Sequence, residues 1–184
     1  RLEGAGVLRV LGGPALGVFT ASGNLGGGDL DAAVGLDAGL DYFGAVNVYG
    51  AALTINGVAF DGSAGGNPAG VAYALANFGS VNNTAQSTVT GQLGLLLNDF
   101  NYGNGTSPQT LTLRNLIAGR TYALTFYNRV WRAGEDRTQT FTTTSGATTN
   151  FNADVGAANT ASWLRYTFLA SGGTETVTIS PTNG

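Results

Sequence analysis

The sequence predicts an all-β protein, an antiparallel β-sandwich behind an extended N-terminal arm. Three observations support this prediction. Apolar and polar residues alternate along several segments in the second half of the 184-residue chain. An Asn-Gly pair separates two apolar runs near the middle of the chain. Hydrophobic residues make up 43% of the sequence, which is enough to build a core in a chain of this length.

Residues 1–41 are predicted to form the arm with a Gly-rich tether, and residues 42–184 the sandwich domain. Apolar runs at 6–11 and 15–20 precede the flexible stretch Ser22–Gly28. We expect these runs to pair as a donor strand with a neighbouring subunit, and the alternative is that they pair with their own sandwich. The residues expected to form the donor strand are Val7, Leu8, Val10, Leu11, Leu16, Val18 and Phe19.

The middle of the chain contains one clear signal and two ambiguous ones. Residues 53–60 predict a hairpin, because Asn56-Gly57 supplies the two positive-φ residues of a type I′ turn. The segment 67–79 has the cap residues of a short helix but also alternates like a strand. The segment 91–100 is compatible with a buried strand or with one or two helical turns.

The second half of the chain is predicted to be almost entirely strands. Period-two patterns indicate half-buried antiparallel strands at 110–113, 121–126, 163–168 and 175–179. The segment 137–142 predicts a further, more polar and more exposed strand. The Thr-rich stretch 142–149 is interpreted as the end of that strand and a hairpin loop.

The segment Leu113–Phe126 contains the most specific motif, a Gly-containing turn followed by a strand with an early Tyr. This Tyr is expected to bond back to the preceding loop, as in the corners of β-sandwiches. Together with the segments 95–103, 126–132 and 137–141, the motif resembles the secreted β-jelly-roll, galactose-binding-like domains of sorting-signal-bearing and autotransporter-associated proteins of environmental bacteria. The resemblance covers roughly residues 43–180 and implies a jelly-roll-like sandwich and an extracellular or cell-surface location. It implies no catalytic residue.

Composition argues against most enzyme chemistry. The chain has no His, Cys or Met, and only 10% of its residues are charged. Without His or Cys, only oxygen ligands are available to a metal, so no cofactor is expected. The net charge of -3 gives no electrostatic footprint for nucleic acid. No apolar run approaches the roughly 20 residues of a membrane-spanning helix.

Two candidate ligand sites remain. Aromatic rings can stack on sugars, so the first is a glycan platform of Tyr127, Trp131, Arg132, Glu135 and Trp163. Packing in the core or at its rim is the alternative for these rings. The second is the acidic stretch Asp29–Asp41 with the carboxylates that calcium prefers, although its spacing fits no EF-hand loop and a solvated loop is the simpler interpretation.

The expected function is therefore a structural subunit of an extracellular filament or surface assembly, with a second copy of the chain as its partner. The alternative is a secreted carbohydrate-binding module, with a polysaccharide as its partner.

Overall fold

The computed structural model of the chain describes residues 6–11, 17–26, 28–30, 32–65, 67–82, 87–102 and 107–182. The first half contains β1 (Gly6–Leu11), β2 (Val18–Ala21), the short 3-10 helices η1 (Gly28–Leu30) and η2 (Ala32–Val34), β3 (Tyr42–Asn47), β4 (Leu53–Ile55), β5 (Val58–Gly62), β6 (Tyr73–Ala76) and β7 (Ser80–Asn82). The second half contains α1 (Gly91–Asn98), β8 (Phe100–Tyr102), β9 (Gln109–Leu113), β10 (Thr121–Arg129), β11 (Thr138–Thr143), β12 (Thr148–Asn152), β13 (Ala161–Leu169) and β14 (Glu175–Pro181).

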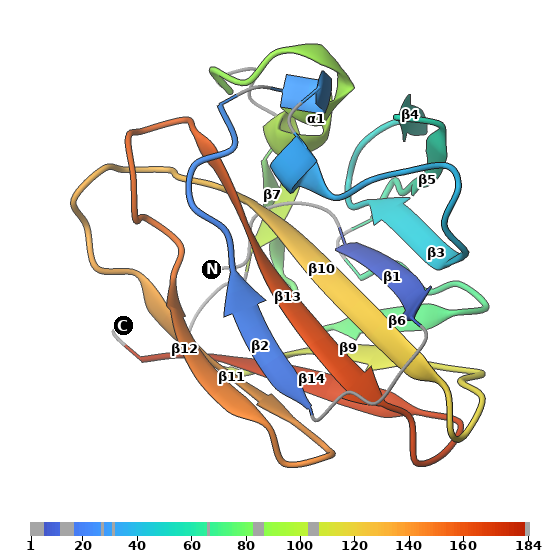
Figure 1. Cartoon of the computed structure of the whole chain (residues 1–184). Coiled ribbons are helices and arrows are strands. Elements are labelled where there is room, and N and C mark those ends of the chain that lie inside the picture. The colour runs from blue at the N-terminus through green and yellow to red at the C-terminus, as the bar shows by residue number, and fades with distance from the viewer. Residues whose placement is uncertain are drawn as a thin grey trace.

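Two large sheets face each other and enclose the main core (Figure 1). The larger sheet has the order β2-β13-β10-β1-β3-β5-β4, and the smaller has the order β12-β11-β14-β9-β6. Alternate residues of β10 and β13, such as Phe126 and Phe168, meet Phe141 and Ile179 of the smaller sheet between them. Except for the parallel pair β3–β5, the strands pair antiparallel. The prediction of an all-β, sandwich-like protein with antiparallel sheets is confirmed.

The strands expected in the second half of the chain are present as β9, β10, β11, β13 and β14. The Thr-rich stretch forms the turn between β11 and β12, as expected. The expectation that β11 is an exposed strand is only partly met. The strand lies between β12 and β14, so Gln139 and Phe141 are buried while its alternate residues are not.

The middle of the chain contains the predicted hairpin and resolves both ambiguous segments. Asn56 and Gly57 have φ of 50° and 79° and join β4 to β5. The first ambiguous segment contains the strand β6, because its backbone pairs with β9. The second forms α1, whose Leu93, Leu96 and Leu97 share one buried face.

A third layer, built from α1, η1, η2 and the β4–β5 hairpin, packs on the outer face of the larger sheet at the end where β10 stops and β13 starts (Figure 1). Its apolar side chains form a second core against Tyr127 and Ala161. Asp29 fastens this layer, because its carboxylate accepts hydrogen bonds from the backbone N–H groups of Gln92 (2.8 Å) and Leu93 (2.6 Å) at the start of α1. Every residue of β10, a central strand of the larger sheet, is buried.

Both described strands of the predicted arm lie in the larger sheet of their own chain. β1 occupies a central position between β10 and β3, and β2 forms the edge beyond β13. The division expected at residue 41 is therefore not a boundary in packing, since the sheet contains strands from both sides of it. The reason is that an apolar strand gains backbone hydrogen bonds and burial by pairing, which a free arm forgoes.

The corner expected before β10 is present. Tyr122 is buried at the start of the strand, and its hydroxyl oxygen accepts a hydrogen bond of 3.0 Å from the backbone N–H of Ile117. This contact holds the turn at Gly119 (φ 81°) against the end of the sandwich.

We expect Tyr122→Phe to lower the free energy of unfolding by about 1 kcal/mol, the usual net value of one hydrogen bond. Urea denaturation followed by circular dichroism measures this difference. Tyr49→Phe is the matched control, because the Tyr49 hydroxyl has no hydrogen bond within the described part of the chain. Equal stability of the two variants would contradict the role of the corner.

Candidate functional site

The candidate site is the position that β1 occupies in the larger sheet. All six residues of β1 pair with β10, from Gly6 opposite Phe126 to Leu11 opposite Thr121. On its other edge β1 pairs with β3 from Gly6 opposite Val46 to Arg9 opposite Tyr42, with a bulge after Leu8. Both edges of β1 are hydrogen-bonded, one to β10 and the other to β3. β1 therefore fills a slot between these two strands, and backbone hydrogen bonds close the slot on both sides.

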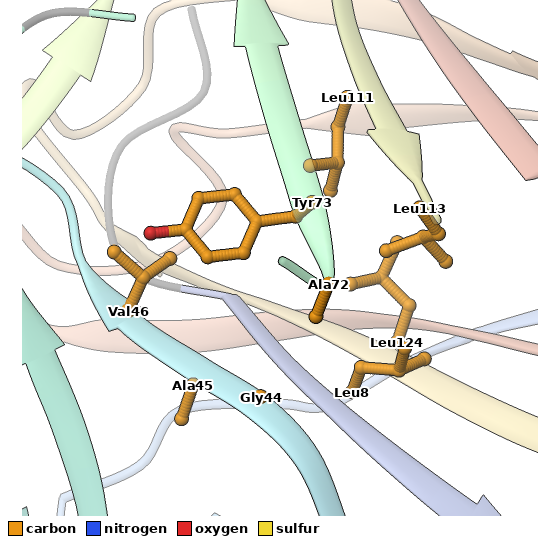
Figure 2. Close-up of a pocket in the computed structure, with 9 residues that line it drawn as sticks. All are labelled: Leu8, Gly44, Ala45, Val46, Ala72, Tyr73, Leu111, Leu113 and Leu124. Atoms are coloured by element: carbon orange, nitrogen blue, oxygen red, sulfur yellow. The ribbon is translucent and has the colours of Figure 1, made fainter. Parts of the chain in front are cut away.

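Leu8 anchors β1 in the core between the two sheets. Its side chain is only 3% exposed and packs in the main core with Leu124. Beside it is an apolar pocket of about 30 Å³. Figure 2 shows how the pocket is formed by residues from both sheets, namely Leu8, Gly44, Ala45, Val46, Ala72, Tyr73, Leu111, Leu113 and Leu124.

One wall of this pocket, formed where β3 meets the residues before β6, was not predicted from the sequence. Gly44 faces Ala72 so closely that a Cβ at position 44 would lie 3.3 Å from the Ala72 methyl group. The available signal was a glycine inside an apolar strand, which often marks a close approach of another backbone. Tyr73 lies on the same wall and was also not predicted. Burial, and to a smaller extent the charge of the nearby Asp61, raises the pKa of its hydroxyl.

Of the other predicted donor-strand residues, Val18 and Phe19 lie in β2. Phe19 turns inward and stacks on Tyr166 with ring centroids 4.7 Å apart, while Val18 is 48% exposed. Three more of these residues belong to β1, where their backbone pairs with β10, namely Val7, Val10 and Leu11. Leu16 lies outside the described residues.

The predicted glycan residues do not form one surface. Tyr127 is fully buried under the outer layer, and its hydroxyl donates a 2.6 Å hydrogen bond to the carbonyl of Val34. Burial raises the pKa of this hydroxyl. The neighbouring ring of Trp163 donates from Nε1 to the carbonyl of Ala33 (2.7 Å) and lies 4.4 Å from the guanidinium carbon of Arg165. Including Tyr127 was wrong, because the outer layer covers the face on which it lies.

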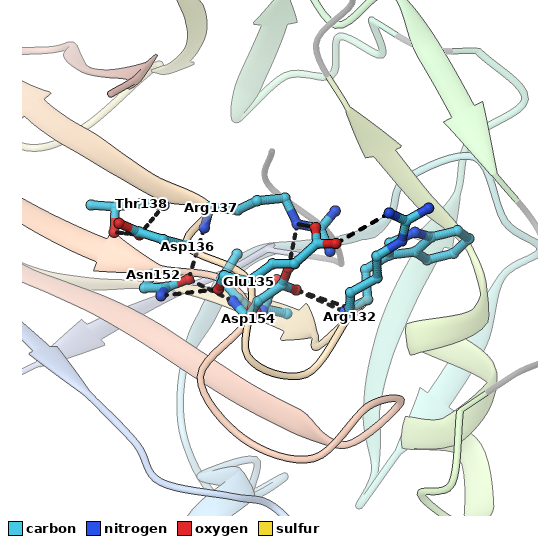
Figure 3. A network of polar contacts seen from close by, with 10 residues as sticks. Arg132, Glu135, Asp136, Arg137, Thr138, Asn152 and Asp154 are labelled. Atoms are coloured by element: carbon cyan, nitrogen blue, oxygen red, sulfur yellow. Dashed lines mark hydrogen bonds and ion pairs between the residues drawn. The ribbon is translucent and has the colours of Figure 1, made fainter. Parts of the chain in front are cut away.

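The other three glycan candidates, Trp131, Arg132 and Glu135, lie on the loop after β10, and Figure 3 shows Arg132 beside Glu135. The carboxylate of Asp154, itself almost fully buried, accepts hydrogen bonds from the backbone N–H groups of Trp131 (2.9 Å) and Arg132 (3.3 Å) and pairs with Arg137. Arg132 and Glu135 form an ion pair of 3.1 Å at the surface. Asp154 had no sequence signal, because its role arises from contacts between distant segments.

Two of the acids predicted as calcium ligands are used otherwise in the fold, and Asp31 lies outside the described residues. Asp29 holds the start of α1, and Asp37 accepts a hydrogen bond from the backbone N–H of Gly39 (2.8 Å). Within the described ranges, no three carboxylates gather into a group that could hold a metal ion.

One partly buried acid lies between the outer layer and β3. Desolvation raises the pKa of Asp99, while a hydrogen bond from Asn47 (3.5 Å) and the charge of Arg129 act in the opposite direction. The ionised carboxylate is therefore less stable in the folded protein than in the unfolded chain.

A comparison with known protein families, with curated proteins and with solved structures found no match. In the portion of the chain that the structure describes, no helix has the length and apolar character needed to cross a membrane.

We expect Leu8→Ala to destabilise the fold by about 2–5 kcal/mol, because it empties a fully packed position next to an existing pocket. Leu30→Ala is the matched control, since Leu30 is 95% exposed and its truncation should change stability by less than about 0.5 kcal/mol. Chemical denaturation of both variants measures the difference. Equal loss of stability in the two variants would show that Leu8 of β1 does not pack in the core as described.

We expect Asp99→Asn to stabilise the protein at pH 7 and to have little effect near pH 3. Folding raises the pKa of Asp99, so this acid lowers the free energy of unfolding once the pH exceeds its pKa in the unfolded chain. The loss is complete above its pKa in the folded protein. The asparagine variant avoids this loss. Thermal unfolding at both pH values measures the effect, and a variant that is less stable at pH 7 would contradict the balance described.

Proposed function

We propose that this protein is a structural subunit of an extracellular filament or surface assembly, and that it polymerises by donor-strand-type β-augmentation. The partner is a second copy of the chain. In the assembly, the β1 segment of one subunit fills the slot between β10 and β3 of the next. The proposal includes a jelly-roll type of sandwich, a location outside the cell and the absence of enzyme activity.

The observation that carries the proposal is the central position of β1. This strand lies between two strands that are distant from it in sequence, and it supplies the core with Leu8. The same backbone hydrogen bonds and the same core contact are available to an identical strand from a neighbouring chain. Exchange therefore replaces each contact by an equivalent one, which is the energetic basis of strand swapping.

The edges of the sheets also favour association. The terminal strands of the two large sheets are β2, β4, β6 and β12, with the sequences VFTA, LTI, YALA and TTNFN. None carries a charged residue, although charges are a common protection of edge strands in monomeric proteins. Each of these strands is short, which itself limits pairing with another chain.

Composition supports the same proposal. The residues that most enzymes use as nucleophiles or as proton carriers near neutral pH, His and Cys, are absent. Low charge and abundant Gly, Thr and Asn fit a structural protein.

The loop that carries Trp131, Arg132 and Glu135 favours carbohydrate binding as a second candidate function. The backbone of this loop is fixed by Asp154, and the guanidinium carbon of Arg129 lies 5.2 Å from the centre of the Trp131 ring. A partly exposed ring beside an exposed Arg–Glu pair suits a sugar. Binding on a glycan array that Trp131→Ala abolishes, by a protein that stays monodisperse, would favour this candidate over the first.

Exchange of β1 can be tested with engineered cysteines, because the chain has none of its own. Arg9 and Ala123 are opposite each other in the β1–β10 ladder, and opposite residues in antiparallel strands lie within disulfide range. One sample of Arg9→Cys is assembled with one of Ala123→Cys and oxidised mildly. Exchange predicts disulfides between the two chains, in filaments visible by negative-stain electron microscopy.

The control replaces Ala123→Cys by Leu30→Cys, an exposed position outside the slot. Equal cross-linking in both mixtures would indicate random collision. A double variant that forms only disulfides within one chain, in a preparation without filaments, would overturn the proposal. Deleting residues 1–20 gives a second test, since filaments of unchanged appearance would exclude a role for the arm.

A further inference from the structure

The strand β3 has an unpaired stretch on the side away from β1. On that side it pairs with β5 only at its end, with Val46 opposite Asp61 and Asn47 opposite Gly62. Residues 42–45 have no ladder partner there among the residues that the structure describes. The cause is visible in Figure 1, where β4 and β5 turn away from β3 into the outer layer.

The apolar pocket lies beside this unpaired stretch. Gly44, Ala45 and Val46 of β3 form one of its walls, and Ala72 and Tyr73 form another (Figure 2). An unpaired backbone edge supplies the hydrogen bonds needed for strand addition, and here it runs along an apolar wall.

The opposite edge of the same sheet is complementary. β2 pairs with β13 through Val18–Ala21, and its other edge has no ladder partner in the described ranges. Both free edges are four residues long and uncharged, with the sequences VFTA and YFGA. They also run in the same direction, because β1 is antiparallel to β3 and, through β10 and β13, to β2 as well.

We infer that in the assembly β2 of one subunit lies parallel to residues 42–45 of the next, so that the larger sheets join into one continuous sheet. This inference rests on the proposed function and adds a second contact to it. The donor subunit provides two neighbouring strands, β1 in the slot and β2 on the edge of β3. Because the two surfaces differ, the contact is head-to-tail and propagates as an open fibre.

The chain between the two strands is long enough for this arrangement. From Leu11 to Val18 it can span at most about 24 Å when extended. Within one chain β2 lies three strands from β1, a distance of about 14 Å, while on the next subunit it would lie two strands away, at about 10 Å. Val18 is opposite Thr167, and across the sheet this level continues through Ala123 and Arg9 to Tyr42. β2 therefore starts near the end of the sheet where β1 stops. If β1 keeps its register in the slot of the next subunit, Val18 at this level lies beside Tyr42 of that subunit.

The test uses exposed positions at the two ends of the proposed contact. Full-length Val18→Cys is assembled with full-length Asp41→Cys and oxidised. The matched comparison is Ala21→Cys with Asp41→Cys. Parallel pairing places position 18 next to 41–42 and position 21 about 10 Å further along, beyond disulfide range. We therefore expect mixed disulfides from the first mixture and at most traces from the second.

Each outcome separates the edge contact from the exchange of β1. Cross-links between the two slot variants, Arg9→Cys and Ala123→Cys, without any between Val18→Cys and its edge partner would overturn the edge contact and leave the proposed function standing. A stronger product from the Ala21→Cys mixture would overturn the parallel arrangement. Cross-links at the edge alone would keep this contact and remove the exchange of β1. Loss of both, together with the absence of filaments, would overturn both.

An exposed variant provides an independent readout. Val18→Lys places a charge on the free edge of β2, where it should shorten or abolish filaments. Because Val18 is half exposed, the monomer should keep its circular dichroism spectrum and melting temperature. Filaments of normal length and yield from this variant would contradict the contact.

Discussion

The larger sheet depends on the hydrogen bonds along the two edges of β1. Without this strand the sheet would consist of two separate parts, β2-β13-β10 and β3-β5-β4. The N–H and C=O groups of β10 and β3 that face β1 would then lose their partners, and such groups are costly to leave unpaired away from water. The core would also lose Leu8 at the point where the pocket already leaves space. A short segment near the N-terminus thus controls the continuity of the whole sheet.

The outer layer has a different consequence, because it decides which aromatic residues can meet a ligand. Tyr127 and Trp163 are opposite each other in the β10–β13 ladder, on the face that this layer covers. Their polar atoms are bonded to the carbonyls of Val34 and Ala33 in η2. The layer is held in turn by Asp29 at the start of α1. An acid that the sequence offered as a metal ligand is therefore part of the packing that hides a predicted glycan residue.

The two proposals on assembly share one physical basis. A β-strand satisfies its backbone groups equally well with its own chain or with an identical one, so concentration and the connecting segment select the partner. The slot for β1 and the free stretch of β3 lie side by side in the same sheet. Strand order therefore links both contacts to a single head-to-tail interface.

Features that arise from neighbouring residues could be predicted from the sequence alone. Alternation predicted β9, β10, β13 and β14, because residues two apart in a strand share a face. Asn56-Gly57 predicted its turn through the positive φ that both residues adopt, and Tyr122 predicted a bond back to the preceding loop, which the structure places at Ile117.

Features that depend on pairing between distant segments emerge only in the folded structure. It placed β1 between β10 and β3, distinguished the strand β6 from the helix α1, buried Tyr127 and engaged Asp29 and Asp154 in backbone contacts. The physical reason is that a strand edge carries almost no sequence code, since its hydrogen bonds come from the backbone that all residues share. Which edges meet is therefore settled by how the layers pack together.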